Sequence, residues 1–241
     1  MKLIMRMAGK ESARIELPIN YRPLIHGMLY TLLSPCEPYA EKLHEQGGGS
    51  GRVFKGFTFS PLQGVYRVEN HTIAFSGEIL LEIRSVDPVM TALLYHEALS
   101  AGSVKIGAQV LEVRRCRLED RHIREEKIRI RMVSPAVVYS TDDSGFSHFF
   151  SPNDPEFADM IRANAMRKCA HFRLPAPDGF RLALLPDSRP RKQLSSFKQT
   201  VLEGWFANFE MESSAACLDL LYQTGLGAKN SEGFGMFEVL G

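Results

Sequence analysis

The two halves of the sequence carry the same order of apolar patterns, and this order limits the fold more than any other feature. Each half contains segments with apolar residues at every second position, typical of strands, and segments with apolar residues three or four apart, typical of helices. In both halves the order is strand, helix, two strands, helix and strand. A β-α-β-β-α-β chain of this kind forms an antiparallel sheet with its helices on one face. The sequence therefore predicts an α+β protein of two tandem ferredoxin-like (RRM-like) domains.

The first half supplies one complete set of these elements. The predicted strands are 2–7, 14–17, 53–60, 64–68, 79–84 and 110–118, and the predicted helices are 21–33, 39–45 and 88–100. Asn20 and Asp87 precede two of these helices and are the expected N-caps, because short polar side chains satisfy the first helical amides. The glycine-rich segment 47–51 reads like a flexible linker, natural or engineered.

The second half repeats the order after a segment of alternating charge, 119–127. We expect this segment to connect the domains, which we place at 1–122 and 123–241. The predicted strands of the second half are 128–134, 180–185, 193–209 (one long strand or a hairpin arm) and 234–240, and its predicted helices are 155–172 and 213–224. The repeat is one of topology and not of residue letters. The aromatic RNP signature of an RRM is missing, so base stacking on the sheet is not supported.

Composition excludes several classes of protein. The chain has 241 residues, a formal net charge of +1 and 44% hydrophobic residues, so it has a real core and no global basic field. Its four cysteines form no CxxC pair, which argues against a disulfide framework and fits a reducing cytoplasm. The apolar start is interrupted by Lys2 and Arg6, and eighteen apolar residues never run together. We expect a cytoplasmic protein with no membrane contact.

The segment 225–235 places four glycines in eleven residues, as two Gly-apolar-Gly clips around five residues that include Lys229 and Asn230. Glycine permits positive φ and close approach to the backbone, so such a loop can offer its amides to a phosphate. It is neither a GxGxxG fingerprint nor a Walker loop, because a strand and not a helix follows it. A connector of two tight turns is the alternative interpretation.

Catalytic metal motifs are absent from the sequence. There is no HExxH, no DxD pair and no EF-hand loop, and His148, Cys169 and His171 have no spacing that would complete a zinc site. GxSxG and Cys-His nucleophile arrangements are missing as well. We therefore expect no metal and no cofactor, and the remaining chemistry is acid-base chemistry.

Four residues of the first half are candidates for that chemistry. His44 ends the short predicted helix, Tyr30 lies on the helix before it, and Lys55 stands at the start of the next strand. Each also has an ordinary structural explanation: a histidine that favours the helix dipole, a core tyrosine and a solvated lysine. His26 precedes Tyr30 by four residues and shares its helix face, so it is the second choice of imidazole.

The pattern of the closing segment resembles that of the CRISPR-associated repeat-processing endoribonucleases. In that family the chain ends in GhG-x(5)-GhG, where h is apolar and the middle run contains a basic residue, here Lys229. The resemblance extends over the whole chain in length and element order. It implies two tandem ferredoxin-like domains and metal-independent cleavage of precursor CRISPR RNA within each repeat. It also implies a catalytic set of Tyr30, His44 and Lys55, with Arg52 as a competing choice for the lysine's role.

The resemblance implies partners and binding residues too. The expected partner is CRISPR repeat RNA, and an effector ribonucleoprotein complex and a homodimer are further candidates. The arginines 114, 115 and 117 could add to the RNA surface or be the charges of an exposed edge strand. The RNA-binding residues that we expect are Gly225, Gly227, Lys229, Asn230, Gly233 and Gly235.

Two other functions stay open from the sequence. The first is a repeat-RNA-binding subunit of a ribonucleoprotein that does not cut. The second is a ferredoxin-like module that binds a small molecule or a protein and has no RNA affinity.

Overall fold

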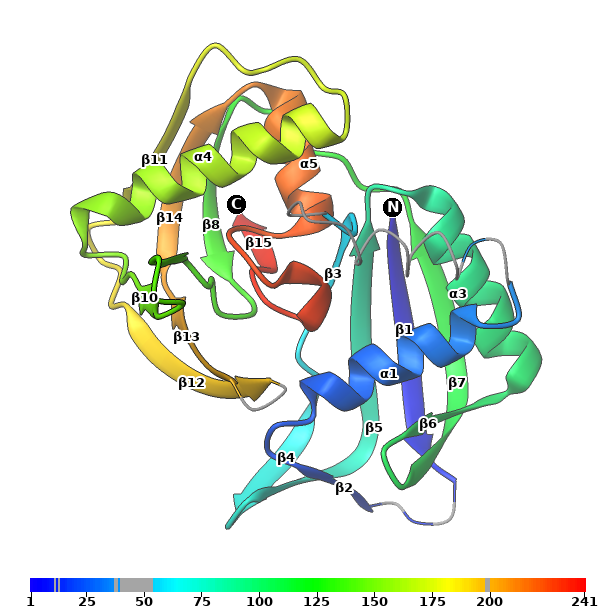
Figure 1. Ribbon diagram of the computed structural model, residues 1–241. Coiled ribbons are helices and arrows are strands. Elements are labelled where there is room, and N and C mark those ends of the chain that lie inside the picture. The colour runs from blue at the N-terminus through cyan, green and yellow to red at the C-terminus, as the bar shows by residue number, and fades with distance from the viewer. Residues whose placement is uncertain (11, 13, 37–38, 40–53, 198–199) are drawn as a thin grey trace. The chain divides into compact units, whose positions relative to one another are not determined.

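The chain divides into two compact units, Met1–Arg121 and His122–Gly241. The computed structural model describes residues 1–10, 12, 14–36, 39, 54–197 and 200–241 (Figure 1). Within these residues, none of the helices is long and apolar enough to cross a membrane.

The N-terminal unit is built on one antiparallel sheet. Its strands are β1 (Lys2–Gly9), β2 (Arg14–Pro18), β3 (Phe57–Phe59), β4 (Gln63–Glu69), β5 (Thr72–Ser85), β6 (Ser103–Ile106) and β7 (Gln109–Glu119), and its helices are α1 (Arg22–Leu33) and α3 (Pro88–Ala101). The strand order is β2-β5-β1-β7-β6, and β3 and β4 also pair with β5. The strands β3-β5-β1-β7 thus have the order of a ferredoxin-like sheet, with α1 and α3 across the same face (Figure 1).

Alternation along the strands decides which residues form the core of this unit. In β1, Leu3, Met5 and Met7 are fully buried, while the residues between them point to the other face. The helix α1 buries Ile25 and Leu29 over the same cluster. The periodicities of the sequence therefore turn one face of the sheet toward the helices.

The helix caps differ from the prediction at one of the two starts. Asp87 is the N-cap of α3, and its Oδ1 accepts a hydrogen bond of 2.9 Å from the amide of Val89, as predicted. The prediction of Asn20 was wrong, because α1 has Tyr21 as its N-cap and no side-chain cap bond. Pro23 lies in the first turn of α1, where its missing N–H costs nothing.

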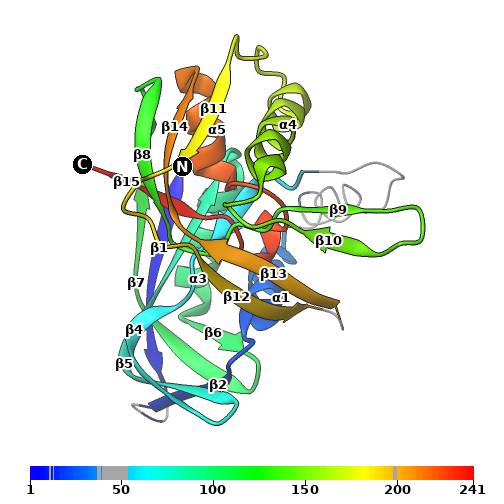
Figure 2. The same cartoon turned by 90° about the vertical axis from the view of Figure 1, so that its left-hand side faces the viewer.

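The C-terminal unit repeats the architecture with two added hairpins. Its strands are β8 (Lys127–Met132), β9 (Tyr139–Thr141), β10 (Ser147–Phe149), β11 (Phe180–Leu184), β12 (Arg191–Phe197), β13 (Thr200–Phe206), β14 (Asn208–Ser213) and β15 (Phe237–Leu240), and its helices are α4 (Pro155–His171), α5 (Ala215–Thr224) and the 3-10 turn η1 (Asn230–Glu232). The main sheet has the order β11-β14-β8-β15, which is again ferredoxin-like. Figure 2 shows α4 and α5 on one side of it.

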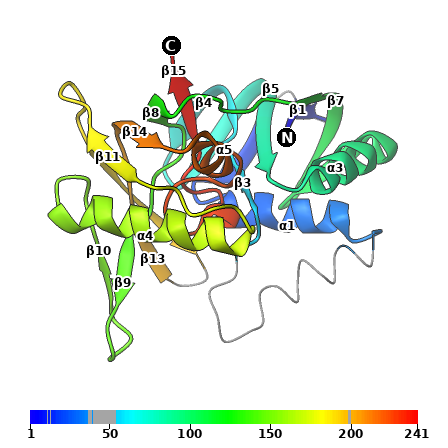
Figure 3. The ribbon, with the colours of Figure 1, turned by 90° about the horizontal axis from the view of Figure 1, so that it is seen from above.

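The sequence mispredicted the middle of this unit. Of the two alternatives for the segment 193–209, the long strand was wrong and the hairpin is present: β12 and β13 pair, and the third strand of the main sheet is the separate β14. The hairpin β9-β10 was not predicted, and it projects away from the sheet in Figures 2 and 3. The predicted helix 39–45 and the segment 47–51 fall almost wholly outside the described residues.

Both units have the connectivity that the sequence predicted. The strand order second, third, first, fourth occurs in each sheet, because the first and third strands pair at the centre and each helix crosses back over the same face. The predicted fold class, two tandem ferredoxin-like domains, is confirmed.

Candidate active site and closing glycine loop

Two of the three predicted catalytic residues meet in the N-terminal unit. Tyr30 lies on the last turns of α1, and Lys55 stands shortly before β3, 25 residues further along the chain. The Nζ atom of Lys55 donates a hydrogen bond of 2.6 Å to the hydroxyl oxygen of Tyr30, and it lies 4.9 Å from the centroid of the tyrosine ring. The fold thus brings together a cation and a hydroxyl group that the sequence only suggested separately.

The environment of Tyr30 keeps its hydroxyl group protonated. Burial raises the pKa of Tyr30 to about 12, because the phenolate is poorly solvated there. The oxygen accepts a hydrogen bond from Lys55 and still carries its own proton, since a phenol is both donor and acceptor. At neutral pH Tyr30 can therefore donate a proton, and the Lys55 ammonium can stabilise the phenolate that this leaves.

An imidazole lies beside this pair. The ring centroids of His26 and Tyr30 are 4.5 Å apart and the rings are tilted by 30°, as expected for residues four apart on one helix. His26, the second choice from the sequence, therefore adjoins the candidate site. His44 and Arg52 lie outside the described residues.

A second tyrosine was missed by the sequence reasoning. The hydroxyl of Tyr39 donates a hydrogen bond of 2.8 Å to Asp87 Oδ2, while the other oxygen of Asp87 caps α3. Burial, followed by this hydrogen bond and the carboxylate charge, raises the pKa of Tyr39 well above its usual value. The contact joins the chain after α1 to the start of α3, and no local pattern could reveal it because its partners are 48 residues apart.

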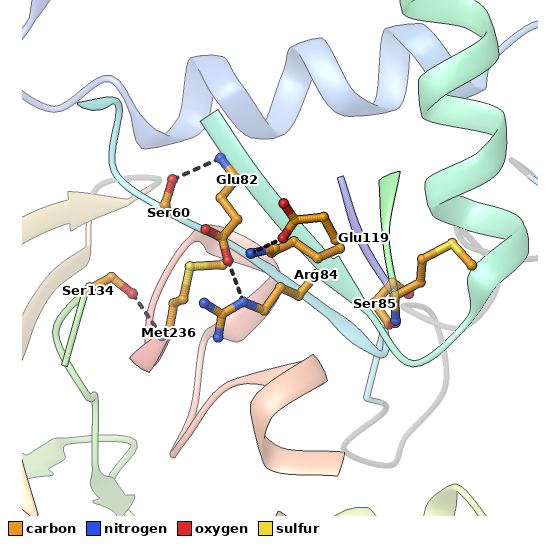
Figure 4. Close-up of polar contacts among 9 residues, drawn as sticks. Ser60, Glu82, Arg84, Ser85, Glu119, Ser134 and Met236 are labelled. Carbon is orange, nitrogen blue, oxygen red and sulfur yellow. Dashed lines mark hydrogen bonds and ion pairs between the residues drawn. The ribbon is translucent and has the colours of Figure 1, made fainter. Parts of the chain in front are cut away.

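The helix-free face of the N-terminal sheet carries charged groups. Glu82 and Arg84 alternate along β5 with the fully buried Leu81 and Ile83, so they point to the opposite face. Arg84 Nε lies 2.5 Å from Glu82 Oε1, and Ser60 Oγ accepts a hydrogen bond of 3.0 Å from the amide of Glu82 (Figure 4). Arg84 and Glu82 therefore form an ion pair with each other.

Two of the three arginines that we predicted for the RNA surface form ion pairs within the protein. On β7, Arg114 Nη1 lies 3.0 Å from Glu112 Oε1, and Arg117 forms an ion pair with Glu119. Arg115 lies between them on the same strand. Any RNA phosphate at Arg114 or Arg117 would have to compete with these carboxylates.

The closing loop of the C-terminal unit needs its four glycines for their backbone conformation. Gly225, Gly227, Gly233 and Gly235 have φ values of +87°, +74°, +87° and +77°, which L side chains rarely adopt. A Cβ atom on Gly235 would lie 2.0 Å from the carbonyl oxygen of Leu226. All four glycines are buried, so they shape the loop from within.

Most of the loop amides are used inside the protein. The residues whose N–H groups donate to protein carbonyls, at 2.7 to 3.1 Å, are Gly225, Leu226, Ala228, Glu232, Gly233 and Gly235. The expectation that the loop offers these amides to a phosphate was therefore wrong for these six. The partly exposed segment of the loop is 228–232. Within the loop, these five residues are the ones that a ligand in solution could contact.

Two polar residues of that segment have different environments. The Lys229 side chain is 32% exposed, and its Nζ lies 3.4 Å from Glu232 Oε1. The side chain of Asn230 is bound within the unit: its Nδ2 donates to the carbonyl oxygens of Leu226 and Phe234 at 3.2 and 3.1 Å. Lys229 is thus the loop side chain best placed for an anion, while Asn230 holds the loop.

The arrangement defines an α+β protein of two ferredoxin-like units whose last helix and strand are joined by a glycine-clipped loop. The family model "CRISPR associated protein Cas6, C-terminal" matches residues 118–239, half of the chain and nearly all of the C-terminal unit. The chain belongs to the Cas6 family of CRISPR-associated proteins.

Relatives of the whole chain agree with this. It is 24% identical over 249 residues to "CRISPR-associated endoribonuclease Cas6 1" of Methanocaldococcus jannaschii, with 94% of this chain and 92% of the relative covered. A solved Cas6-related protein from Pyrococcus furiosus has a TM-score of 0.84 at 21% identity, covering 100% and 98% of the two chains. A structure described as a Cas6 product complex has a TM-score of 0.72 at 18% identity, covering 99% of each chain. These structures share the fold.

Proposed function

We propose that the protein is a metal-independent endoribonuclease that cleaves precursor CRISPR RNA within its repeats. Membership of the Cas6 family and the likeness to a curated endoribonuclease support repeat RNA as the substrate. The observation that carries the chemistry is the 2.6 Å hydrogen bond between Lys55 and the protonated Tyr30 hydroxyl. The RNA supplies its own nucleophile, the 2′-hydroxyl group, so the protein needs only to move protons and to stabilise charge.

The candidate residues can divide these tasks. An imidazole, from His44 or from His26, takes the proton of the 2′-hydroxyl as it attacks the adjacent phosphorus. The Tyr30 hydroxyl gives its proton to the 5′-oxygen as the P–O5′ bond breaks, and Lys55 stabilises the negative charge of the transition state. The products are a 2′,3′-cyclic phosphate and a 5′-hydroxyl end, and no oxidant, metal or water enters this step.

RNA binding is assigned to the closing loop. The partly exposed segment 228–232 presents Lys229 to a phosphate, and the four glycines give that segment its shape. A lysine that neutralises one phosphate adds affinity that weakens as salt rises. We propose that Lys229 contributes this contact, and that Arg115, on β7 of the N-terminal unit, contributes a phosphate contact of its own.

The assignment of the imidazole is tested by two alanine variants. His44→Ala lowers the single-turnover rate on labelled repeat RNA by about 10²- to 10⁴-fold if His44 is the base, the usual contribution of general acid-base catalysis. His26→Ala serves as the matched comparison on α1. Full activity in His44→Ala with a comparable loss in His26→Ala would move the role to His26, and full activity in both would contradict histidine catalysis.

The non-catalytic alternative predicts repeat-RNA binding without cleavage, so the single-turnover cleavage assay separates it from the proposed function. A small-molecule or protein-binding module predicts no RNA affinity, and filter binding with repeat and scrambled RNA tests this.

We also propose a cytoplasmic location and association with a CRISPR ribonucleoprotein or with a second copy of the chain. Light scattering after size exclusion, with and without repeat RNA, tests the association.

A further inference from the structure

A buried lysine occupies a position where the C-terminal unit would ordinarily place an apolar side chain. Lys168 lies on the face of α4 that also carries Ile161, Ala165 and Cys169, and only 1% of its surface is exposed. Lysine is almost never fully buried unless it is paired, because it is costly to remove an ammonium group from water. A buried ammonium group therefore needs hydrogen-bond acceptors close to it.

Those partners are two neutral oxygens of the closing loop. The Nζ atom of Lys168 donates to the carbonyl oxygen of Gly225 at 2.5 Å and to Asn230 Oδ1 at 2.7 Å. The Nδ2 group of Asn230 in turn donates to the carbonyls of Leu226 and Phe234, at the start and the end of the loop. Only one orientation of the amide satisfies its three contacts, because the ammonium group needs an acceptor and the two carbonyls need a donor. The Lys168 ammonium and the Asn230 amide thus connect α4 to the start of the loop, at Gly225 and Leu226, and to its end, at Phe234.

The flanking glycines leave the space for this arrangement. A Cβ atom on Gly225 would lie 2.7 Å from Asn230 Nδ2, and one on Gly235 would lie 2.5 Å from the same atom. Contacts this short would displace the amide of Asn230. Lys168, Asn230, Gly225 and Gly235 therefore form one unit, which we call the loop clamp.

The loop clamp acts next to the residue that we assign to RNA. Lys229 directly precedes Asn230 and has φ +62°, a left-handed conformation that is costly for a residue other than glycine and persists where its surroundings enforce it. The hydrogen bonds that hold the Asn230 side chain therefore also restrict the backbone conformation of its neighbour Lys229.

We propose that Lys168 is a positioning residue for RNA binding, which holds the loop clamp so that Lys229 meets an RNA phosphate. The proposal rests on the RNA-binding function proposed for the loop. Lys168 itself does not touch RNA, since it is buried and both of its loop contacts are with the protein.

The variant Lys168→Met tests the proposal. Methionine fills the core position without burying a charge, but it leaves the Gly225 carbonyl and Asn230 Oδ1 without their donor. We therefore expect the variant to fold with a thermal unfolding midpoint, followed by the fluorescence of the single Trp205, that is lower by a few degrees. Repeat-RNA affinity falls by about tenfold, because the binding-competent loop is only partly populated. The single-turnover rate at saturating RNA is unchanged. The matched control Lys127→Met removes an exposed lysine of the same unit and shifts affinity by less than about twofold, since exposed ion pairs contribute little.

The same binding assay separates this proposal from the proposed function. If Lys229→Ala leaves RNA affinity unchanged, the RNA-binding function of the loop fails. If Lys229→Ala weakens binding and Lys168→Met does not, only the positioning role fails. In the double variant, Lys168→Met adds little to the effect of Lys229→Ala, because both act on one contact. If Lys168→Met does not fold, Asn230→Ala opens the clamp from its other side, and normal RNA affinity in that variant would overturn the proposal.

A pH titration gives a readout that a purely structural role would not produce. Burial lowers the pKa of Lys168 to about 7, and the titratable groups that act on it are the thiols of Cys217 on α5 and Cys169 on α4. Burial raises the pKa of Cys169 to about 12, so that thiol stays neutral. As pH rises from 6 to 8.5 the ammonium loses its proton, the clamp weakens, and RNA affinity falls more in the wild type than in Lys168→Met.

Stability moves in the opposite direction over the same range. The unfolded chain keeps the lysine protonated up to its ordinary pKa of 10.5, whereas the folded chain releases the proton near pH 7. The unfolded state then binds more protons, so the free energy of unfolding rises with pH in the wild type relative to Lys168→Met. An identical pH dependence of RNA affinity in the two proteins would overturn the proposal.

Discussion

At the scale of single residues, the candidate site depends on how the protein changes the acidity of one hydroxyl group. Burial raises the pKa of Tyr30 to about 12, so the hydroxyl keeps its proton at neutral pH, and its oxygen accepts a hydrogen bond from Lys55. A protonated tyrosine with a neighbouring cation suits a leaving oxygen that must gain a proton. The sequence named Tyr30 and Lys55 as separate candidates, and only the family resemblance joined them in one catalytic set, because a pair 25 residues apart leaves no local pattern.

Removing the Tyr30 hydroxyl tests its role as the acid. We expect Tyr30→Phe to lower the single-turnover rate by about 10²- to 10⁴-fold with repeat-RNA affinity nearly unchanged, because the ring and its packing remain. Tyr66→Phe on the exposed strand β4 is the matched control and keeps full activity. A wild-type rate in Tyr30→Phe would remove tyrosine from the mechanism.

The glycines of the closing loop can also be tested one at a time. Gly235→Ala places a Cβ atom 2.0 Å from the Leu226 carbonyl oxygen at φ +77°, so we expect it to lower the free energy of unfolding by more than about 2 kcal/mol. Gly179→Ala is the control, since nothing lies within 4 Å of its added Cβ. Denaturant unfolding followed by Trp205 fluorescence measures both. Equal stabilities would show that the loop tolerates a side chain there.

At the scale of elements, the sequence predicted best where local pattern alone decides the structure. The helices α3, α4 and α5 follow apolar spacing and begin within one or two residues of their predicted starts. The hairpin β9-β10 was missed because its short strands are only partly buried and show no alternation. The strand β14 was missed because only its pairing with β8 and β11 separates it from the hairpin before it. Strands defined by distant partners give weak local signals.

The start of α3 offers a test of an element that the sequence did predict. Asp87→Ala removes the cap bond to Val89 and the acceptor of the Tyr39 hydroxyl, so we expect a loss of about 2 to 3 kcal/mol. Hydrogen exchange of the first α3 amides and chemical unfolding followed by circular dichroism measure the loss. The exposed Asp143 is the control, and Asp143→Ala should change stability by less than about 0.5 kcal/mol. An equal effect of the two variants would contradict the double role of Asp87.

At the scale of the whole molecule, one connectivity occurs twice and carries different chemistry in each unit. The N-terminal unit places Tyr30, Lys55 and His26 together, and the C-terminal unit supplies the glycine loop with Lys229. The order of patterns in the sequence was enough to predict this duplication. It could not predict the loop clamp, because Lys168 and Asn230 are 62 residues apart and a buried lysine looks like a surface lysine in a sequence.

The central claim is that the 2′-hydroxyl group of the RNA is the nucleophile and that the protein acts without a metal. The most direct measurement compares labelled repeat RNA with the same RNA carrying a single 2′-deoxy nucleotide at the cut site, both in excess EDTA. We predict that the first RNA is cut to a 2′,3′-cyclic phosphate and a 5′-hydroxyl end, and that the second is bound with equal affinity and stays intact. Cleavage of the 2′-deoxy RNA, or a requirement for magnesium in cutting the first, would contradict the account.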